Sequence, residues 1–217
     1  MIRAFSYNEF LFLLSAVQWT LALSAIAFVG GATVGLFIAL ARTSDIKPVR
    51  LAATGYIQLF QGTPLLMQLF LVFFGATVMG LDLNPWAAAA LGLTLNASAF
   101  LGEIWRGCIQ SVPRGQWEAA SALGLRYPGL MRYVILPQAV KVAVPPTVGF
   151  LVQLIKSTSL ASIIGFTELT RAGQIVNNAT FQPFLVFGIV AALYFMMCWP
   201  LSLLSARLER RYAVATR

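Results

Sequence analysis

Five long apolar stretches, separated by shorter polar links, dominate the pattern of hydrophobic and polar positions along this chain. The hydrocarbon core of a bilayer is about 30 Å thick and an α-helix rises about 1.5 Å per residue, so one crossing takes roughly 20 mostly apolar residues. None of the stretches alternates with the period of two that the strands of a membrane barrel show. The pattern therefore predicts five membrane-spanning helices, at about residues 10–41, 51–78, 85–108, 137–155 and 184–206.

The overall composition supports the same class of protein. Of 217 residues, 59% are hydrophobic and 10% are charged, with a mean hydropathy of +0.80. A soluble globular domain carries about 25% charged residues. We therefore expect an all-α integral membrane protein in which residues 1–217 form a single transmembrane domain.

The distribution of lysine and arginine predicts how the helices are oriented. With five spans, twelve of the 15 cations fall on one side, namely Arg42, Lys47, Arg50, Arg106, Arg114, Arg126, Arg132, Lys141, Arg207, Arg210, Arg211 and Arg217. Only Arg3, Lys156 and Arg171 fall on the other side. By the positive-inside rule, the N-terminus is outside and the C-terminus is in the cytosol. The net charge of +8 is thus a topology signal, since these cations form no dense basic patch of the kind that binds nucleic acid.

The residues that metal sites and catalytic sites need are missing. The chain has no histidine, and its two cysteines, Cys108 and Cys198, lack metal-ligand spacing. It also has no glycine-rich phosphate loop and no nucleophile elbow. We therefore expect no catalytic residue, metal or cofactor in this chain, so that any ATP used must be bound by another protein.

Polar residues inside the second span are the first candidates for a functional site. At 100° per residue, four of them lie within about 80° of one another on a helix: Thr54, Gln58, Gln61 and Gln68. Pro64, in "QGTP", removes a backbone donor and predicts a bend beside Gly62 and Thr63. Such a stripe either lines a path for a solute or bonds neighbouring helices to one another, and both interpretations stay open.

The third span repeats this pattern with Asn96, Glu103 and Gln110, each seven residues apart. An ionisable residue at membrane depth is a candidate functional residue. The alternative for Glu103 is an ion pair with Arg106, one turn further on, at the cytosolic end of the span. In the first span, Gly31-x-x-x-Gly35 predicts close packing against another helix.

The fourth span contains two predicted irregularities. Pro145 and Pro146 should loosen the helix near its middle, and a polar run follows in "QLIKSTSLAS" with Gln153, Lys156, Ser157, Thr158 and Ser159. A discontinuous helix with clustered hydroxyls is typical of a transporter gate or solute contact. The alternative is a lysine whose ammonium group extends to the membrane surface at the start of a loop. Beyond it, the sequence predicts an amphipathic helix from Glu168 to about Asn177 that ends before Pro183.

A cytosolic segment between the third and fourth spans reads "EAASALGLRYPGLMRYVILP". It predicts a short helix over residues 118–125, broken by Gly124, Pro128 and Gly129, within a loop spanning residues 113–136. An amphipathic helix lying on the membrane is one interpretation. Its small side chains favour close approach to a partner protein instead.

These motifs resemble those of a known family. Glu118, Ala119, Ala120, Gly124, Val134, Leu136 and Pro137 are similar to the cytoplasmic coupling loop of type I ABC importer permeases, with Val134 where isoleucine is usual. "QGTPLLMQLF", "LNASAFLGEIWRGCIQSVPRGQWEAA" and "LIKSTSLASIIGFTELTRAGQ" resemble motifs of the polar amino acid (glutamine/histidine-type) permeases. The resemblance covers nearly the whole chain, in order and at the family's spacing.

The resemblance implies a subunit that catalyses no reaction, in the bacterial cytoplasmic (inner) membrane. Its partners would be a second permease subunit, identical or paralogous, a dimer of ATPase subunits that binds ATP and Mg, and an extracytoplasmic solute-binding protein. Coupling to the ATPase would involve Glu118, Ala119, Ala120, Gly124, Leu125, Leu136 and Pro137. The residues that we expect along the solute path or gate are Gln58, Gln61, Gly62, Thr63, Pro64, Gln68, Asn96, Glu103, Gln153, Lys156, Ser157, Thr158 and Ser159.

Ser157 bears on which amino acid is carried, because many relatives have an acidic residue at this position. Without that acid a cationic substrate is disfavoured, and neutral or acidic polar amino acids gain weight, although Glu103 remains available to an ammonium group. A self-contained channel or ion-coupled carrier is the alternative function. Such a carrier would be expected to contain an internal repeat, and the five spans show none.

Overall fold

The structure is a computed structural model that describes residues 4–213, so that the predicted topology markers Arg3 and Arg217 lie outside the described part. Every regular element in this range is helical. The helices are α1 (Tyr7–Thr43), α2 (Lys47–Gly62), α3 (Leu65–Val78), α4 (Pro85–Gln110), α5 (Arg114–Ala122), α6 (Tyr127–Leu130), the π-helix η1 (Met131–Ile135), α7 (Leu136–Ser157), the 3₁₀-helix η2 (Thr158–Ser162), α8 (Leu169–Thr180) and α9 (Pro183–Ala213). The predicted all-α class is confirmed.

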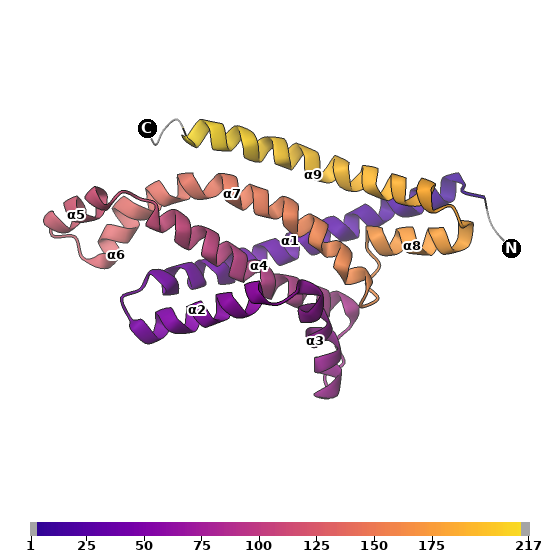
Figure 1. The fold of residues 1–217 in the computed structure, drawn as a ribbon, viewed down its shortest axis with the longest axis horizontal. Coiled ribbons are helices and arrows are strands. Elements are labelled where there is room, and N and C mark those ends of the chain that lie inside the picture. Colours follow the sequence, from indigo (N-terminus) through magenta and orange to yellow (C-terminus); the bar gives the residue numbers. More distant parts are fainter. Residues whose placement is uncertain (1–3, 214–217) are drawn as a thin grey trace.

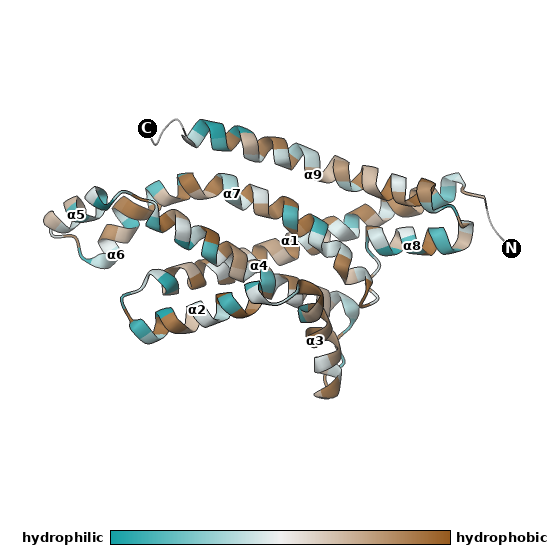
Figure 2. Ribbon diagram, viewed as in Figure 1, coloured by the Kyte–Doolittle hydropathy of each residue, from teal (hydrophilic) through white to brown (hydrophobic). Residues whose placement is uncertain are grey.

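Four long helices, α1, α4, α7 and α9, form the body of the molecule (Figure 1). The start of α1 and α8 lie at one end, and α5, α6 and the end of α9 lie at the other. Hydrophobic residues cover the middle of the long helices, whereas hydrophilic residues gather at the C-terminal end of α9 (Figure 2). Large apolar side chains on α9 are exposed, including Phe184 at 96%, which is expected of a helix that faces lipid or another membrane subunit.

Helices α1 and α4 pack closely because small residues line their contact. A Cβ atom added to Gly31 would lie 2.6 Å from Cβ of Ala97, and one added to Gly35 would lie 3.0 Å from the backbone oxygen of Ser98. Only glycine fits at this distance. The close packing that Gly31 and Gly35 predict is therefore confirmed, and its partner is α4.

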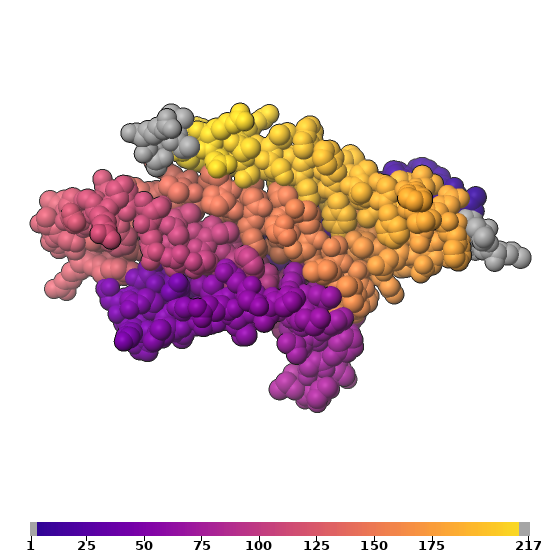
Figure 3. All heavy atoms as spheres, viewed as in Figure 1, coloured from indigo at the N-terminus to yellow at the C-terminus, as the bar shows by residue number. Residues whose placement is uncertain are grey.

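The predicted second span is broken into α2 and α3, which meet at 102° around Thr63 and Pro64. The bend that Pro64 predicts is therefore confirmed, but the sequence did not predict so sharp an angle. Helix α3 projects away from the body and forms a protrusion in the space-filling view (Figure 3). By length and composition, four helices suffice to cross a membrane, and the bent pair makes a fifth candidate.

The predicted loosening of the fourth span at Pro145 and Pro146 is wrong, because α7 runs through both prolines without interruption. Together with α6, η1 and η2 it forms one helical segment over Tyr127–Ser162. Hydroxyl groups bond backbone carbonyls near the prolines. Ser205 Oγ of α9 donates to the Pro145 carbonyl oxygen at 2.9 Å, and Thr147 Oγ1 donates to that of Ala143 at 2.7 Å. The Ser205 bond joins α7 to α9 beside the two prolines.

The two remaining helices follow the predictions closely. Helix α8 is the predicted amphipathic segment, and it ends at Thr180, before Phe181, whose φ of 53° is left-handed. Helix α9 continues beyond the predicted residue 206 to Ala213. The amphipathic helix before Pro183 is therefore confirmed.

Candidate functional site

The break between α2 and α3 is stabilised by two buried amides, Gln68 and Asn96. Gln68 Nε2 donates to the carbonyl oxygens of Phe60 at 2.8 Å and Thr63 at 3.1 Å, and Asn96 Nδ2 donates to Gln68 Oε1 at 3.0 Å. The end of α2 leaves these carbonyls without helical donors, and buried carbonyls need partners. Gln68 and Asn96 thus bond neighbouring segments, which was one of the two interpretations of the polar stripe.

The stripe predicted along the second span does not lie on one helix. Thr54, Gln58 and Gln61 belong to α2, whereas Gln68 lies on α3 beyond the break. Thr54 Oγ1 accepts a hydrogen bond from Arg42 Nη1 at 2.7 Å, while Gln58 is exposed. The helical period that places these residues together on a continuous helix stops at Pro64.

A cavity of about 370 Å³ nevertheless collects polar residues that the sequence predicts for a solute path. It lies among α2, the start of α3, α4 and α7. Five predicted residues line it: Gln61, Thr63, Asn96, Gln153 and Ser157. Gln61 Nε2 also donates to the Ala99 carbonyl oxygen at 3.4 Å, which joins α2 to α4. The cavity lining contains no charged side chain.

Apolar and aromatic residues complete this cavity, and the sequence analysis did not find them: Phe60, Leu65, Phe100, Phe150 and Leu154. The rings of Phe100 and Phe150 are stacked with their centroids 5.8 Å apart. Phenylalanine occurs throughout the apolar stretches, so no local signal separates these rings from the others. A cavity with mostly apolar walls and a few polar groups is the usual form of a small-molecule site.

The predicted motif around Lys156 is divided among different surroundings. Ser157 faces the cavity just described, and Thr158 is fully buried. Lys156 and Ser159 line a separate cavity of about 340 Å³ with residues of α8 and α9. The structure therefore does not bring the whole motif into one site.

Glu103 lies in a charged cluster instead of in the cavity. It pairs with Arg106, with Arg106 Nε 2.8 Å from Oε2 and Nη2 2.5 Å from Oε1. Arg42 Nη2 lies 3.9 Å from Oε2, and Arg106 also hydrogen-bonds Gln110. The predicted pairing of Glu103 with Arg106 is confirmed, and the cluster ties α1 to α4.

The loop that we predict to be cytosolic forms a compact unit around a small apolar core. Ala120 of α5 is buried with Leu130, Met131, Ile135 and residues of α4 and α7. Gly124 has a φ of 76°, which is left-handed, so it ends α5 without strain. Helix α5 begins at Arg114, one turn before the predicted start at Glu118. Pro128, where a break was predicted, lies in the first turn of α6.

The predicted coupling residues are distributed over this unit. Glu118 and Ala119 are exposed on α5, Leu125 packs against the core, and Leu136 and Pro137 begin α7. Leu123 and Tyr133 are also exposed, at 82% and 69%. The unit thus presents small and apolar groups at the end of the molecule.

Glu168 is a functional candidate that the sequence showed only as a helix start. It is fully buried and accepts hydrogen bonds from the Thr170 and Arg171 amides, both at 2.9 Å, and from the Tyr194 hydroxyl at 2.7 Å. Burial raises the pKa of this carboxyl, an effect larger than the opposing one of its hydrogen bonds. The Leu169 amide donates to Thr20 Oγ1 at 3.2 Å, which joins α8 to α1 as Tyr194 joins it to α9.

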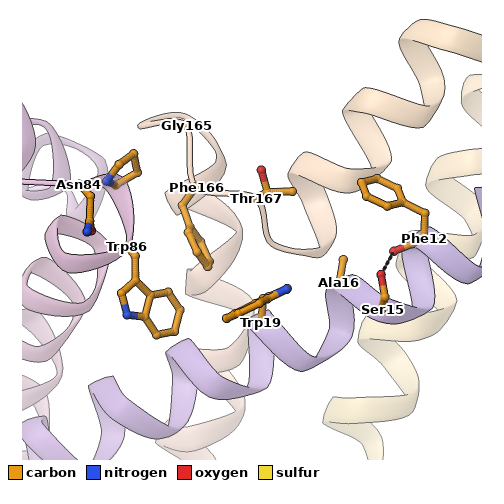
Figure 4. A pocket seen from close by; sticks show the side chains of 10 residues that line it. Phe12, Ser15, Ala16, Trp19, Asn84, Trp86, Gly165, Phe166 and Thr167 are labelled. Atoms are coloured by element: carbon orange, nitrogen blue, oxygen red, sulfur yellow. Dashed lines mark hydrogen bonds between the residues drawn. The ribbon is translucent and has the colours of Figure 1, made fainter.

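An open, aromatic-lined pocket of about 540 Å³ lies between α1, the start of α4 and the segment before α8 (Figure 4). The rings of Trp19, Trp86 and Phe166 converge there, and the centroid of the Trp86 ring lies 6.0 Å from that of Trp19 and 5.0 Å from that of Phe166. Tryptophan is enriched where membranes meet water. This cluster is typical of such an interfacial belt, and the sequence analysis did not identify it.

Comparison with known proteins adds independent information. Residues 31–214 match the family of the binding-protein-dependent transport system inner membrane component. The chain is 37% identical to the probable amino-acid ABC transporter permease protein YckA of Bacillus subtilis (strain 168), over 95% of this chain and 91% of that one. It is 39% identical to the L-cystine transport system permease protein TcyB of the same organism, over 90% and 84%.

A solved structure agrees with the sequence matches. The chain is similar to a crystal structure of an amino acid ABC transporter with histidines, with a TM-score of 0.88 and 38% sequence identity. The similarity covers 96% of this chain and 100% of that chain.

Proposed function

The chain belongs to the family of binding-protein-dependent transport system inner membrane components, and we propose that it forms the membrane path of an ABC importer for a polar amino acid. The relatives YckA and TcyB are named as permeases for amino acids and L-cystine. Permeases of this family do not hydrolyse ATP themselves, since the ATPase is a separate protein. The chain would act in the bacterial cytoplasmic membrane.

The observation that carries this proposal is the convergence of neutral polar residues on one cavity. Gln61, Thr63, Asn96, Gln153 and Ser157 come from three helices: α2 and its C-terminal end, α4 and α7. The side chains of Asn96 and Thr63 also hydrogen-bond Gln68 at the bend, whereas Gln153 and Ser157 line the cavity from α7. Because this lining has no charge, it supports an amino acid with a neutral polar side chain.

We further propose five crossings, with the bent α2–α3 pair as the second. An odd number of crossings agrees with the start of α1 and the end of α9 lying at opposite ends (Figure 1). The cation-rich end, with α5 and the end of α9, would face the cytosol. A fifth crossing through the bend would be supported by the buried amides there, which leave fewer backbone carbonyls unpaired in the membrane.

Partners would cover the exposed apolar surfaces at both ends and on α3. Leu71 and Val78 on the projecting α3 are 73% and 88% exposed, and a second permease subunit would bury them. The exposed face of α5, with Glu118 and Ala119, would enter a groove on the ATPase. A solute-binding protein would deliver the amino acid at the end that carries α8.

The test is transport by the assembled importer in proteoliposomes. Gln153→Leu should reduce uptake of labelled glutamine at least tenfold, mainly through a higher KM, because it removes a polar contact in the cavity. Gln182→Leu, at an exposed position before α9, is the matched control and should leave uptake unchanged. Equal effects of the two variants would contradict a solute site in this cavity, and uptake by the chain alone without ATP would indicate a channel or carrier.

A further inference from the structure

The cavity of about 340 Å³ between α7, α8 and α9 has no part in the proposed solute path. It is lined by Lys156, Ser159, Thr170 and Tyr194, with an apolar wall of Phe187, Val190 and Ala191. It shares no lining residue with the cavity around Gln153. Lys156 is exposed and forms no ion pair with any residue between 4 and 213.

Each of the three hydroxyl groups of this cavity already donates its proton in a hydrogen bond within the protein. Ser159 Oγ donates to the Lys156 carbonyl oxygen at 2.7 Å, and the Tyr194 hydroxyl donates to Glu168 Oε2 at 2.7 Å. Thr170 Oγ1 lies 3.1 Å from the Tyr194 oxygen. Because the Tyr194 proton points to Glu168, Thr170 must donate in that contact. What the hydroxyls offer a ligand is therefore lone pairs, and they act as acceptors.

The two sides of the cavity offer a ligand opposite hydrogen-bonding groups, donors on one side and acceptors on the other. The Lys156 ammonium supplies three donors and a positive charge. On the other side, the acceptor oxygens of Thr170 and Tyr194 are backed by the buried Glu168 carboxylate. This arrangement suits a ligand in which an anion is joined by a short link to an ammonium group that still has N–H donors.

The surroundings indicate where such a ligand comes from. On the part of the α9 surface beside the apolar wall, further large apolar side chains are exposed, with Phe184 at 96% and Phe195 at 61%. A ligand in this cavity thus has an apolar helix surface beside it, along which acyl chains can lie. A free zwitterion would leave that surface unused.

We propose that this cavity binds the headgroup of a phosphatidylethanolamine-type lipid. Lys156 holds the phosphate through charge-assisted hydrogen bonds. Thr170 and Tyr194 accept hydrogen bonds from the ethanolamine ammonium, and the glycerol lies against Val190 and Ala191. Phosphatidylcholine has no N–H donor and phosphatidylglycerol has no ammonium, so both bind less well. The inference is independent of the proposed transport function.

Native mass spectrometry of the protein, purified in detergent with whatever subunits it carries, measures this directly. Phosphatidylethanolamine, phosphatidylglycerol and phosphatidylcholine with identical acyl chains are titrated separately. We expect one tightly held phosphatidylethanolamine per chain and about tenfold weaker binding in Lys156→Gln, a loss of about 1.4 kcal/mol. Lys141→Gln, at an exposed lysine on the same helix but outside the cavity, should bind as the wild type does.

A second variant tests the ammonium contact. Thr170→Val should remove most of the preference for phosphatidylethanolamine over phosphatidylcholine, and Thr170→Ser, which keeps the hydroxyl, should restore it. Equal affinity of the wild type for the three lipids would overturn the proposal, because it would leave only a lysine that reaches any headgroup. Equal binding by Lys156→Gln and Lys141→Gln would also overturn it, and so would displacement of the lipid by millimolar phosphoethanolamine or glutamine.

Discussion

Two short helices, α5 and α8, connect long helices at opposite ends of the molecule and are held in different ways (Figure 1). Helix α8 has a buried carboxylate at its start and is bonded to α1 and α9. Helix α5 has no side-chain cap and buries only Ala120. A short helix is marginal without such contacts. The difference indicates that its own chain holds α8 more firmly than α5, as would suit a helix that we propose to contact the ATPase.

The largest effect is expected at the exposed surface of α5, where we propose contact with the ATPase. Glu118→Lys should lower solute-stimulated ATP hydrolysis of the assembled importer more than tenfold, because a reversed charge opposes contact with the ATPase. Its free energy of unfolding should change by no more than about 0.5 kcal/mol, since Glu118 is exposed. Unchanged stimulation, measured by phosphate release, would contradict the coupling role.

The next effect concerns the buried carboxylate of α8. Glu168→Ala leaves two helix amides and the Tyr194 hydroxyl without their acceptor, so we expect a loss of about 2–4 kcal/mol in the free energy of unfolding. Denaturant titration in detergent measures it. Glu209→Ala, at an exposed position of α9, is the control and should change stability little. A loss no larger than that of the control would show that α8 is not held by this carboxylate.

The smallest effect is expected from alanine substitutions of one glycine in each helix, because the space around the two glycines differs. A Cβ atom added to Gly173 of α8 would lie 2.8 Å from Val190, so Gly173→Ala should cost about 1–3 kcal/mol. No atom lies within 4 Å of one added to Gly115 of α5, so Gly115→Ala should instead stabilise the chain by about 0.5–1 kcal/mol. Thermal unfolding of both variants measures the contrast. If the melting temperatures of both variants shifted in the same direction, the two glycines would not differ in how closely they are packed.

The sequence predicted the spans and the amphipathic α8 because both depend on local patterns. An apolar run of about 20 residues defines a crossing, and Glu168 before an amphipathic stretch defines a helix start. Pro64 likewise predicted a bend. The sequence could not give its angle, because Gln68 and Asn96, which stabilise the broken geometry, meet only when α3 and α4 pack together.

The candidate site was predicted only in part, because some of its residues carry a local signal and others do not. Gln61 and Gln153 are recognisable as polar residues in apolar helices, and the structure brings them to one cavity. The aromatic rings beside them resemble every other phenylalanine in the chain. Lys156 was grouped with Ser157 because they are adjacent, yet successive residues on a helix point about 100° apart, and the two line different cavities.

By itself, the sequence determined the membrane class, the all-α fold, the family and the existence of a short helical loop between the third and fourth apolar stretches, because hydropathy, helical period and short motifs are local properties of the chain. Only the tertiary structure decided that the second span breaks at 102°, that α7 passes through two prolines, and that Glu168 is buried against Tyr194. The break and the burial of Glu168 depend on side chains from other segments that satisfy backbone or charged groups, and no local pattern records which segments will meet.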